Sequence, residues 1–179
     1  MKTIARLFAL LVLLAVIGAA ALLWVRPVPA PVPQPLPPLV GTVDRIVIEK
    51  SARRMVLMQA GQAVRSYRIA LGFTPTGDKA RQGDGRTPEG VFTINRRNDK
   101  SAYHLSLGLD YPQAEDRARA RAGGYDPGGD IMIHGQPNSL PEGYIVKGDW
   151  TAGCIAVTNA EMREIWAATP TGTPVEIRP

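Results

Sequence analysis

The 179-residue sequence contains one cysteine, Cys154, and two histidines, His104 and His134. A lone cysteine excludes a disulfide within the chain, which is the usual structural role of cysteine in exported proteins. A zinc site needs three or four nitrogen, sulfur or oxygen ligands. These three residues and one carboxylate, such as Asp149, would exhaust the supply, and no pair has the short spacing typical of metal ligands. We therefore expect no metal site and no cofactor.

The chain also has little excess charge of either sign and no internal repeat. The first 38 residues hold Lys2, Arg6 and Arg26 but no acidic residue, and beyond them 18 basic residues stand against 16 acidic ones. This balance lacks the basic stripe and interleaved aromatics that a nucleic-acid partner requires. The sequence therefore excludes a nucleic-acid-binding class, and the unbiased composition indicates one folded unit with appendages.

A long apolar run is present only at the N-terminus. Leu7–Val25 is uncharged and would span roughly 28 Å as a helix, close to the thickness of a bilayer core. This length favours an uncleaved membrane anchor over residues 1–25, with a cleaved signal peptide as the alternative. The flanking basic residues favour a cytoplasmic N-terminus. We therefore predict a periplasmic or otherwise extracytoplasmic protein of the cell envelope, anchored to the inner membrane.

Proline dominates the next segment, residues 26–40, where it occupies nearly every second position. Such a stretch offers few backbone donors and no core residues, so it is typical of a semi-rigid polyproline II spacer. Recognition by a proline-binding module is the alternative function. We interpret the segment as a linker that holds a domain, residues 41–179, away from the membrane.

The domain 41–179 shows short β-branched and apolar runs between glycine, proline and asparagine, which predicts a mainly β (α+β) fold with a few short helices. Between 54 and 72 we expect two strands joined by a turn at Ala60 and Gly61. Strand 104–111 is expected to place Leu105, Leu107 and Leu109 on one face and His104 on the other. The remaining strands are predicted at 42–50, from 91, at 130–135 and at 172–179, and helices at 112–124 and after a capping box of Thr158 and Glu161.

Cys154 lies in the stretch GDWTAGCIAVTN, and three roles are open to it: a buried hydrophobe, half of a bridge to another chain, or a nucleophile. Gly153 permits a sharp turn and close approach of a substrate to the backbone N–H groups. Ile155 and Val157 alternate as a buried strand does, which fixes the thiol on a rigid element. This context favours the nucleophile.

A cysteine nucleophile gains from a nearby imidazole, because a free thiol is only a few per cent ionised at neutral pH. His134 ends a predicted strand before a loop rich in proline, asparagine and glycine that is long enough to cover a cleft. We predict it to be the base. His104, on the polar face of its strand, is expected to contact substrate or to form a structural hydrogen bond.

Several motifs together resemble the L,D-transpeptidase (YkuD-type) family. These are IMIHG and TAGCI, with sixteen residues between His134 and Thr151, together with RTPEG, HLSLGLDYP and DPGGDIMIHG. The resemblance covers most of residues 42–178. It implies an L,D-transpeptidase-like β-sandwich or barrel in the cell envelope that acts on peptidoglycan stem peptides.

The resemblance also implies a mechanism. A thiolate at Cys154 attacks the carbonyl of diaminopimelate and forms a thioester, which passes to an amine or to water. His134 is the implied base, and the Gly135 carbonyl orients its ring. The N–H groups of Gly153 and Cys154 hold the oxyanion, and Thr151 supports the turn.

Two positions differ from many members of the family, because Ala152 and Ala156 stand where histidine and arginine are common. The stretch DWTAGCIAVTN is similar to a branch that includes a hydrolase releasing envelope lipoprotein from peptidoglycan. The alternatives to acyl transfer are therefore hydrolysis of peptidoglycan-linked protein or crosslinks, and a non-catalytic peptidoglycan-binding module.

Overall fold

A computed structural model describes Val12 and residues 37–179. The chain divides into two units, Met1–Pro37 and Pro38–Pro179, and the elements from β1 to β8 lie in the second. The predicted membrane or signal segment, apart from Val12, and most of the linker 26–40 lie outside the described residues. Within the part that is described, no helix is both long enough and apolar enough to span a membrane.

The second unit consists of eight strands and two short helices, α2 and α3. Their bounds are β1 Arg45–Glu49, β2 Arg54–Gln59, β3 Gln62–Arg68, β4 Gly90–Asn98, β5 Ser106–Leu109, α2 Ala114–Gly123, β6 Met132–His134, β7 Ile155–Ala156, α3 Asn159–Ala168 and β8 Pro174–Arg178. This confirms the prediction of a mainly β fold with a few short helices.

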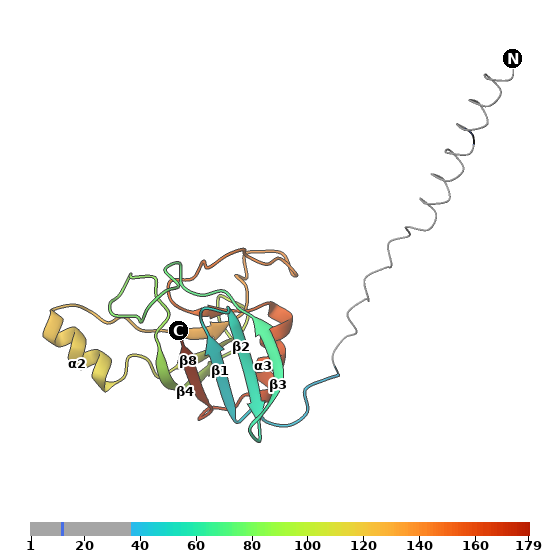
Figure 1. The fold of residues 1–179 in the computed structure, drawn as a ribbon, viewed down its shortest axis with the longest axis horizontal. Helices are drawn as coiled ribbons and strands as arrows, with labels where there is room; N and C mark the ends of the chain where they lie inside the picture. The colour runs from blue at the N-terminus through green and yellow to red at the C-terminus, as the bar shows by residue number, and fades with distance from the viewer. Residues whose placement is uncertain (1–11, 13–36) are drawn as a thin grey trace, which may run out of the picture. The chain divides into compact units, whose positions relative to one another are not determined.

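The strands form one continuous sheet in the order β3-β2-β1-β8-β4-β5-β6-β7. β1 is parallel to β8 and β6 is parallel to β7, whereas the other neighbours are antiparallel. Figure 1 shows the sheet with α3 packed close to it and α2 at the periphery. The core lies between the sheet and α3, whose Met162, Ile165 and Ala168 are buried.

The two ends of this strand order are joined to each other. Ala70, just after β3, exchanges backbone hydrogen bonds with Ala156 of β7, each 2.9 Å long. Next to this pair, the Thr151 N–H donates to the Leu71 carbonyl at 3.1 Å, and the Phe73 N–H donates to the Thr151 carbonyl at 2.9 Å. The sheet is therefore curled, and the segment that holds Cys154 is fixed along the joined edge.

Local sequence signals account for several elements. Ala60 and Gly61 both have positive φ, at 49° and 76°, which is the two-residue hairpin turn predicted between β2 and β3. The capping box that opens α3 is also confirmed: Thr158 Oγ1 accepts from the Glu161 N–H, and the Glu161 carboxylate accepts from the Thr158 N–H. The helix therefore begins where its sequence predicts.

The prediction for strand 104–111 is wrong in two respects. β5 begins only at Ser106, and His104 lies before it with φ of 67°, so His104 is not on a strand face. All four residues of β5 are buried, although alternation between an apolar and a polar face was expected. The reason is that β5 is an inner strand between β4 and β6 of a curled sheet, with α3 against it.

Candidate active site

The β6–β7 ladder pairs the segments that carry the predicted base and the predicted nucleophile. The two strands run parallel, with Ile133 opposite Ile155 and His134 opposite Ala156. Cys154 directly precedes β7, and alternation extended back by that one residue predicts its side chain on the face of Ala156 and His134. The ladder thus brings the chain segments of His134 and Cys154 side by side, although they are far apart in the sequence.

A hydroxyl-centred turn positions Cys154 at the start of β7. Thr151 Oγ1 donates to the Cys154 carbonyl at 2.7 Å and accepts from the Gly153 N–H at 3.1 Å. Gly153 has φ of 138°, and a Cβ there would lie 2.7 Å from the Arg86 carbonyl oxygen. Only glycine fits this turn. The Gly153 N–H, expected to bind an oxyanion, donates here to Thr151.

Two further glycines allow backbone segments to pack against this turn, and sequence reasoning did not single them out. A Cβ on Gly72 would lie 2.1 Å from the Gly85 carbonyl oxygen and 3.1 Å from the Cα of Gly153. A Cβ on Gly85, which has φ of 67°, would overlap the ring of Phe73. The turn that precedes Cys154 is therefore enclosed by main chain from the segments after β3 and before β4.

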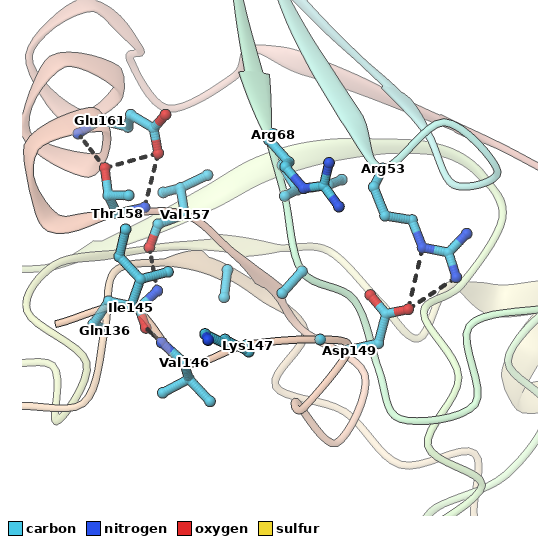
Figure 2. Close-up of a pocket in the computed structure, with 14 residues that line it drawn as sticks. Arg53, Arg68, Gln136, Ile145, Val146, Lys147, Asp149, Val157, Thr158 and Glu161 are labelled. Carbon is cyan, nitrogen blue, oxygen red and sulfur yellow. Dashed lines mark hydrogen bonds and ion pairs between the residues drawn. The ribbon is translucent and has the colours of Figure 1, made fainter. Parts of the chain in front are cut away.

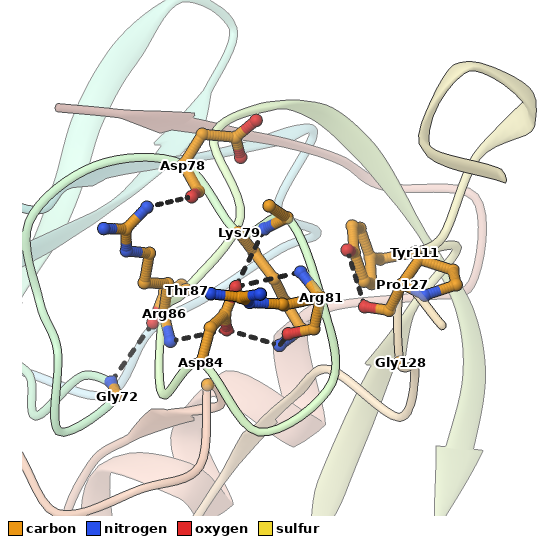
Figure 3. Close-up of polar contacts among 12 residues, drawn as sticks. Gly72, Asp78, Lys79, Arg81, Asp84, Arg86, Thr87, Tyr111, Pro127 and Gly128 are labelled. Atoms are coloured by element: carbon orange, nitrogen blue, oxygen red, sulfur yellow. Dashed lines mark hydrogen bonds and ion pairs between the residues drawn. The ribbon is translucent and has the colours of Figure 1, made fainter. Parts of the chain in front are cut away.

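The segment before β4 is itself held by a buried ion pair (Figure 3). Lys79 is 3% exposed and donates to the Asp84 carboxylate at 2.8 Å. The same carboxylate accepts the N–H groups of Ala80, Arg81 and Arg86 at 2.8, 3.0 and 3.0 Å. Burial opposes ionisation of Asp84, but these donors outweigh it and hold the pKa of the carboxyl well below its usual range.

The His134 ring is fixed in one tautomer. Its Nδ1 lies 2.7 Å from the Gly135 carbonyl oxygen, which can only accept a hydrogen bond. Nδ1 therefore carries the proton, and Nε2 of the neutral ring has a free lone pair. The ring is 4% exposed and lies against two aromatic rings, with centroid distances of 4.7 Å to Tyr103 and 5.7 Å to Trp150. This arrangement leaves Nε2 as the proton acceptor.

Burial favours the uncharged form of both groups. Burial lowers the pKa of His134, and the hydrogen bond to Gly135 opposes this shift only in part. Burial raises the pKa of the Cys154 thiol against a hydrogen bond from the Met132 backbone, and Sγ lies 3.4 Å from the Asp130 carbonyl oxygen, to which it donates. Without substrate, the site therefore holds a thiol and a neutral imidazole.

Gly135 must also be glycine, because a Cβ there would lie 2.6 Å from Asn159 Oδ1 and 3.0 Å from the Cβ of His104. His104 lies on this side of Gly135, where its Nε2 is 3.3 Å from a guanidinium nitrogen of Arg163. Arginine is a donor only, so Nε2 of His104 accepts this bond.

Asp149, the carboxylate considered as a metal ligand, is used in a different way. One oxygen accepts two bonds from Arg53, at 2.8 and 3.1 Å, and the other accepts the Leu71 N–H at 2.9 Å. This ties the nucleophile segment to the start of β2. Among the described residues, no group of three histidine, cysteine or acidic side chains is placed to bind a metal ion.

A family model described as the L,D-transpeptidase catalytic domain matches residues 43–177. The chain belongs to this family. A relative from Escherichia coli K12 with the name putative L,D-transpeptidase YafK is 32% identical over 134 residues, which is 72% of this chain and 48% of the relative. The chain thus spans about half the length of the curated relatives that it matches.

Two solved structures share the fold. The helical cell shape determining protein Pgp2 from Campylobacter jejuni superimposes with a TM-score of 0.59 at 24% identity, over 77% of this chain and 48% of Pgp2. An L,D-transpeptidase from Xylanimonas cellulosilytica gives a TM-score of 0.53 at 19% identity, over 79% of this chain and 63% of the other. These likenesses establish the curled, mainly β fold of the family.

The protonation state of the site leads to a measurable expectation. Because the pKa of Cys154 is raised and that of His134 is lowered, the ultraviolet absorbance of a thiolate should be missing at neutral pH. It should appear only above the ordinary thiol pKa of about 8.5. Titration of the only cysteine by absorbance measures this directly. Thiolate absorbance at neutral pH that disappears in His134→Ala would instead reveal a resting ion pair.

Proposed function

We propose that this protein is a cysteine L,D-transpeptidase of peptidoglycan, which forms a thioester between Cys154 and the diaminopimelate carbonyl of a stem peptide. The observation that supports the proposal is the β6–β7 ladder, which pairs the segment after Cys154 with His134, an imidazole whose Nε2 has a free lone pair. Membership of the L,D-transpeptidase family supports the same chemistry.

In the proposed reaction, His134 Nε2 takes the proton from Cys154 Sγ as the sulfur attacks the carbonyl carbon. The oxyanion is held by the Cys154 backbone N–H, while Thr151 and the Gly153 N–H maintain the turn. As the scissile C–N bond breaks, the imidazolium returns its proton to the leaving amine. An acceptor amine then attacks the thioester carbonyl and gives a proton to His134. The C–S bond breaks, and the leaving thiolate takes the proton back from the imidazolium, which restores the thiol.

Hydrolysis is the second candidate outcome, and it differs only in that water replaces the acceptor amine. The similarity of DWTAGCIAVTN to a hydrolase-containing branch favours it, while Ala152 and Ala156 leave the choice of acceptor open. Its substrate would be a peptidoglycan-linked envelope protein or a crosslink. A module that binds peptidoglycan without turnover would give neither type of product.

The proposed place of action is the extracytoplasmic side of the cell envelope, with residues 1–25 as an inner-membrane anchor and 26–40 as the spacer. Peptidoglycan occurs in that compartment, and the proposal therefore requires export. The structural relative Pgp2 is described as a helical cell shape determining protein. We infer that cell-wall remodelling by this chain serves cell shape as well.

The products of the purified full chain test this proposal. Incubation with stem tetrapeptides and analysis of the muropeptides by liquid chromatography and mass spectrometry should give new 3-3 crosslinks. Tripeptide without crosslinks would assign hydrolysis in place of transfer. The His134→Gln variant should form either product at least about 100-fold more slowly, since general-base catalysis contributes about 10²- to 10⁴-fold. Peptide binding without any product would overturn the enzyme assignment.

A further inference from the structure

A cavity of about 460 Å³ opens beside the end of β7 (Figure 2). Its lining includes Ala156, which pairs with His134 and follows Cys154 by two residues, and Ala70 on the joined edge of the sheet. Two residues of a strand cover about 6.6 Å. An extended peptide that has its carbonyl at Cys154 and runs along β7 would reach this cavity within one or two of its own residues.

The cavity carries an unbalanced positive charge. Arg53 in its wall is neutralised by Asp149, as Figure 2 shows. Glu161 is occupied by the N–H and hydroxyl groups of Thr158. Neither Arg68 nor Lys147, both of which line the cavity, has a side-chain hydrogen bond or ion pair with any described residue. These two cations lie on opposite walls in Figure 2.

The N-terminus of α3 is not the source of this positive site. Its capping box already satisfies the Glu161 N–H through Thr158 Oγ1, and the Glu161 carboxylate offsets the helix dipole there. An anion in the cavity is therefore held by side chains. The apolar part of the lining, Ile69, Ile145 and Val146, suits an aliphatic chain next to that anion.

The wall that carries Lys147 is anchored to the sheet. Gln136 is 4% exposed; its Oε1 accepts the Val146 N–H at 2.9 Å, and its Nε2 donates to the Val157 carbonyl at 2.6 Å. One buried amide thus joins the loop after β6 to the end of β7. The cavity is preformed, so a ligand does not have to order this wall on binding.

We propose that this cavity binds a carboxylate of the peptide substrate, with Arg68 as the principal contact and Lys147 opposite it. The inference rests on the proposed function, because it assumes that a peptide carbonyl occupies the position next to Cys154. It adds a specificity determinant to that function: substrates must carry a free carboxylate one or two residues from the scissile carbonyl. Guanidinium recognises a carboxylate through two parallel hydrogen bonds, which ammonium cannot provide.

Binding without chemistry tests the inference. The full chain with Cys154→Ala is titrated calorimetrically with a stem tetrapeptide and with three versions, each amidated at one carboxylate: D-glutamate, diaminopimelate or the terminal alanine. We expect one amide to bind about 10- to 100-fold more weakly, as loss of a charged hydrogen bond predicts. That amide identifies the carboxylate. Adding Arg68→Ala should lower the affinity for the free tetrapeptide by the same factor. The doubly substituted protein should then bind the free tetrapeptide and that amide equally well.

Further variants separate this role from a general effect of charge. Arg68→Lys should bind the free tetrapeptide more tightly than Arg68→Ala but more weakly than the arginine-containing protein. Lys147→Ala should lose less affinity than Arg68→Ala. Arg121 is an exposed cation on α2 outside the cavity, so Arg121→Ala should leave the affinity unchanged. Unchanged affinity in Arg68→Ala, equal affinity for all amides, or no measurable binding would overturn the inference. Thioester formation in the wild type combined with any of these results would leave the proposed function intact. Binding that depends on Arg68, without thioester formation in the wild type, would support the carboxylate site but contradict the proposed function.

Discussion

Replacing Cys154 by Ala is expected to abolish turnover, lowering kcat by on the order of 10⁵- to 10⁶-fold, the loss seen when a catalytic nucleophile is removed. The chain has no second cysteine to take its place. The Thr151 and Gly153 contacts that shape the turn involve the backbone of Cys154 and not its sulfur. The variant should therefore keep its fold while losing its chemistry.

The measurement is the rate of product formation from a stem tetrapeptide, with thermal unfolding as a check of folding. Cys154→Ser serves as a matched control, because it keeps the size and the hydrogen-bonding capacity of the side chain but is a weaker nucleophile. Both variants should unfold within a few degrees of the wild type. Product formation by Cys154→Ala at more than a hundredth of the wild-type rate would contradict the nucleophile assignment.

Replacing Asp84 by Asn is expected to lower the free energy of unfolding by about 3 kcal/mol. The substitution leaves Lys79 charged and buried without its counter-ion, and breaking a buried pair in this way costs about 3–5 kcal/mol. The side chains of the pair are only 3% and 10% exposed, so solvent screening does little to reduce the loss. Asn still accepts one hydrogen bond, which places the expected value at the lower end.

The same substitution has a pH signature. The folded-state pKa of Asp84 is depressed, so its contribution to stability is complete above the unfolded value of about 3.9 and is lost as pH falls through the folded value. The difference between wild type and Asp84→Asn should therefore shrink in acid. Urea denaturation at neutral and acidic pH measures both effects.

Asp99→Asn, at an exposed position, is the matched control and should change the unfolding free energy by less than about 0.5 kcal/mol. Asp84→Asn should also lower the rate of product formation, because the carbonyl of Arg86, in the same segment, packs against Gly153. An Asp84→Asn protein as stable as the wild type at neutral pH would show that the ion pair does not hold this segment.

Much of the fold follows from short-range signals in the sequence. The Ala60–Gly61 turn, the capping box of Thr158 and Glu161, and the end of β6 at His134 are all local features, and each lies where the sequence predicts. The bonds between Ala70 and Ala156 were not predictable in this way. They join the two ends of the strand order, and no local pattern encodes the curl of a sheet.

The residues that pack around His134 and the turn before Cys154 could not be predicted from the sequence either. Tyr103 and Trp150, which pack on the imidazole, come from two different loops. Gly72 and Gly85 touch only through the tertiary fold, although the RTPEG turn next to Gly85 was recognised as a motif. The alternating leucines predict a strand that already includes His104. The positive φ of His104 is not a strand conformation, and no sequence pattern signals it.

The most direct test of the account is the site of the covalent intermediate. The full wild-type chain is incubated with a stem tetrapeptide or a carbapenem, quenched in acid, digested and mapped by mass spectrometry. The account predicts one acyl adduct, on the peptide that contains Cys154, released by hydroxylamine as a thioester and formed much more slowly in His134→Gln. Turnover with Cys154 unmodified at every time point, or an adduct on any other residue, would contradict it.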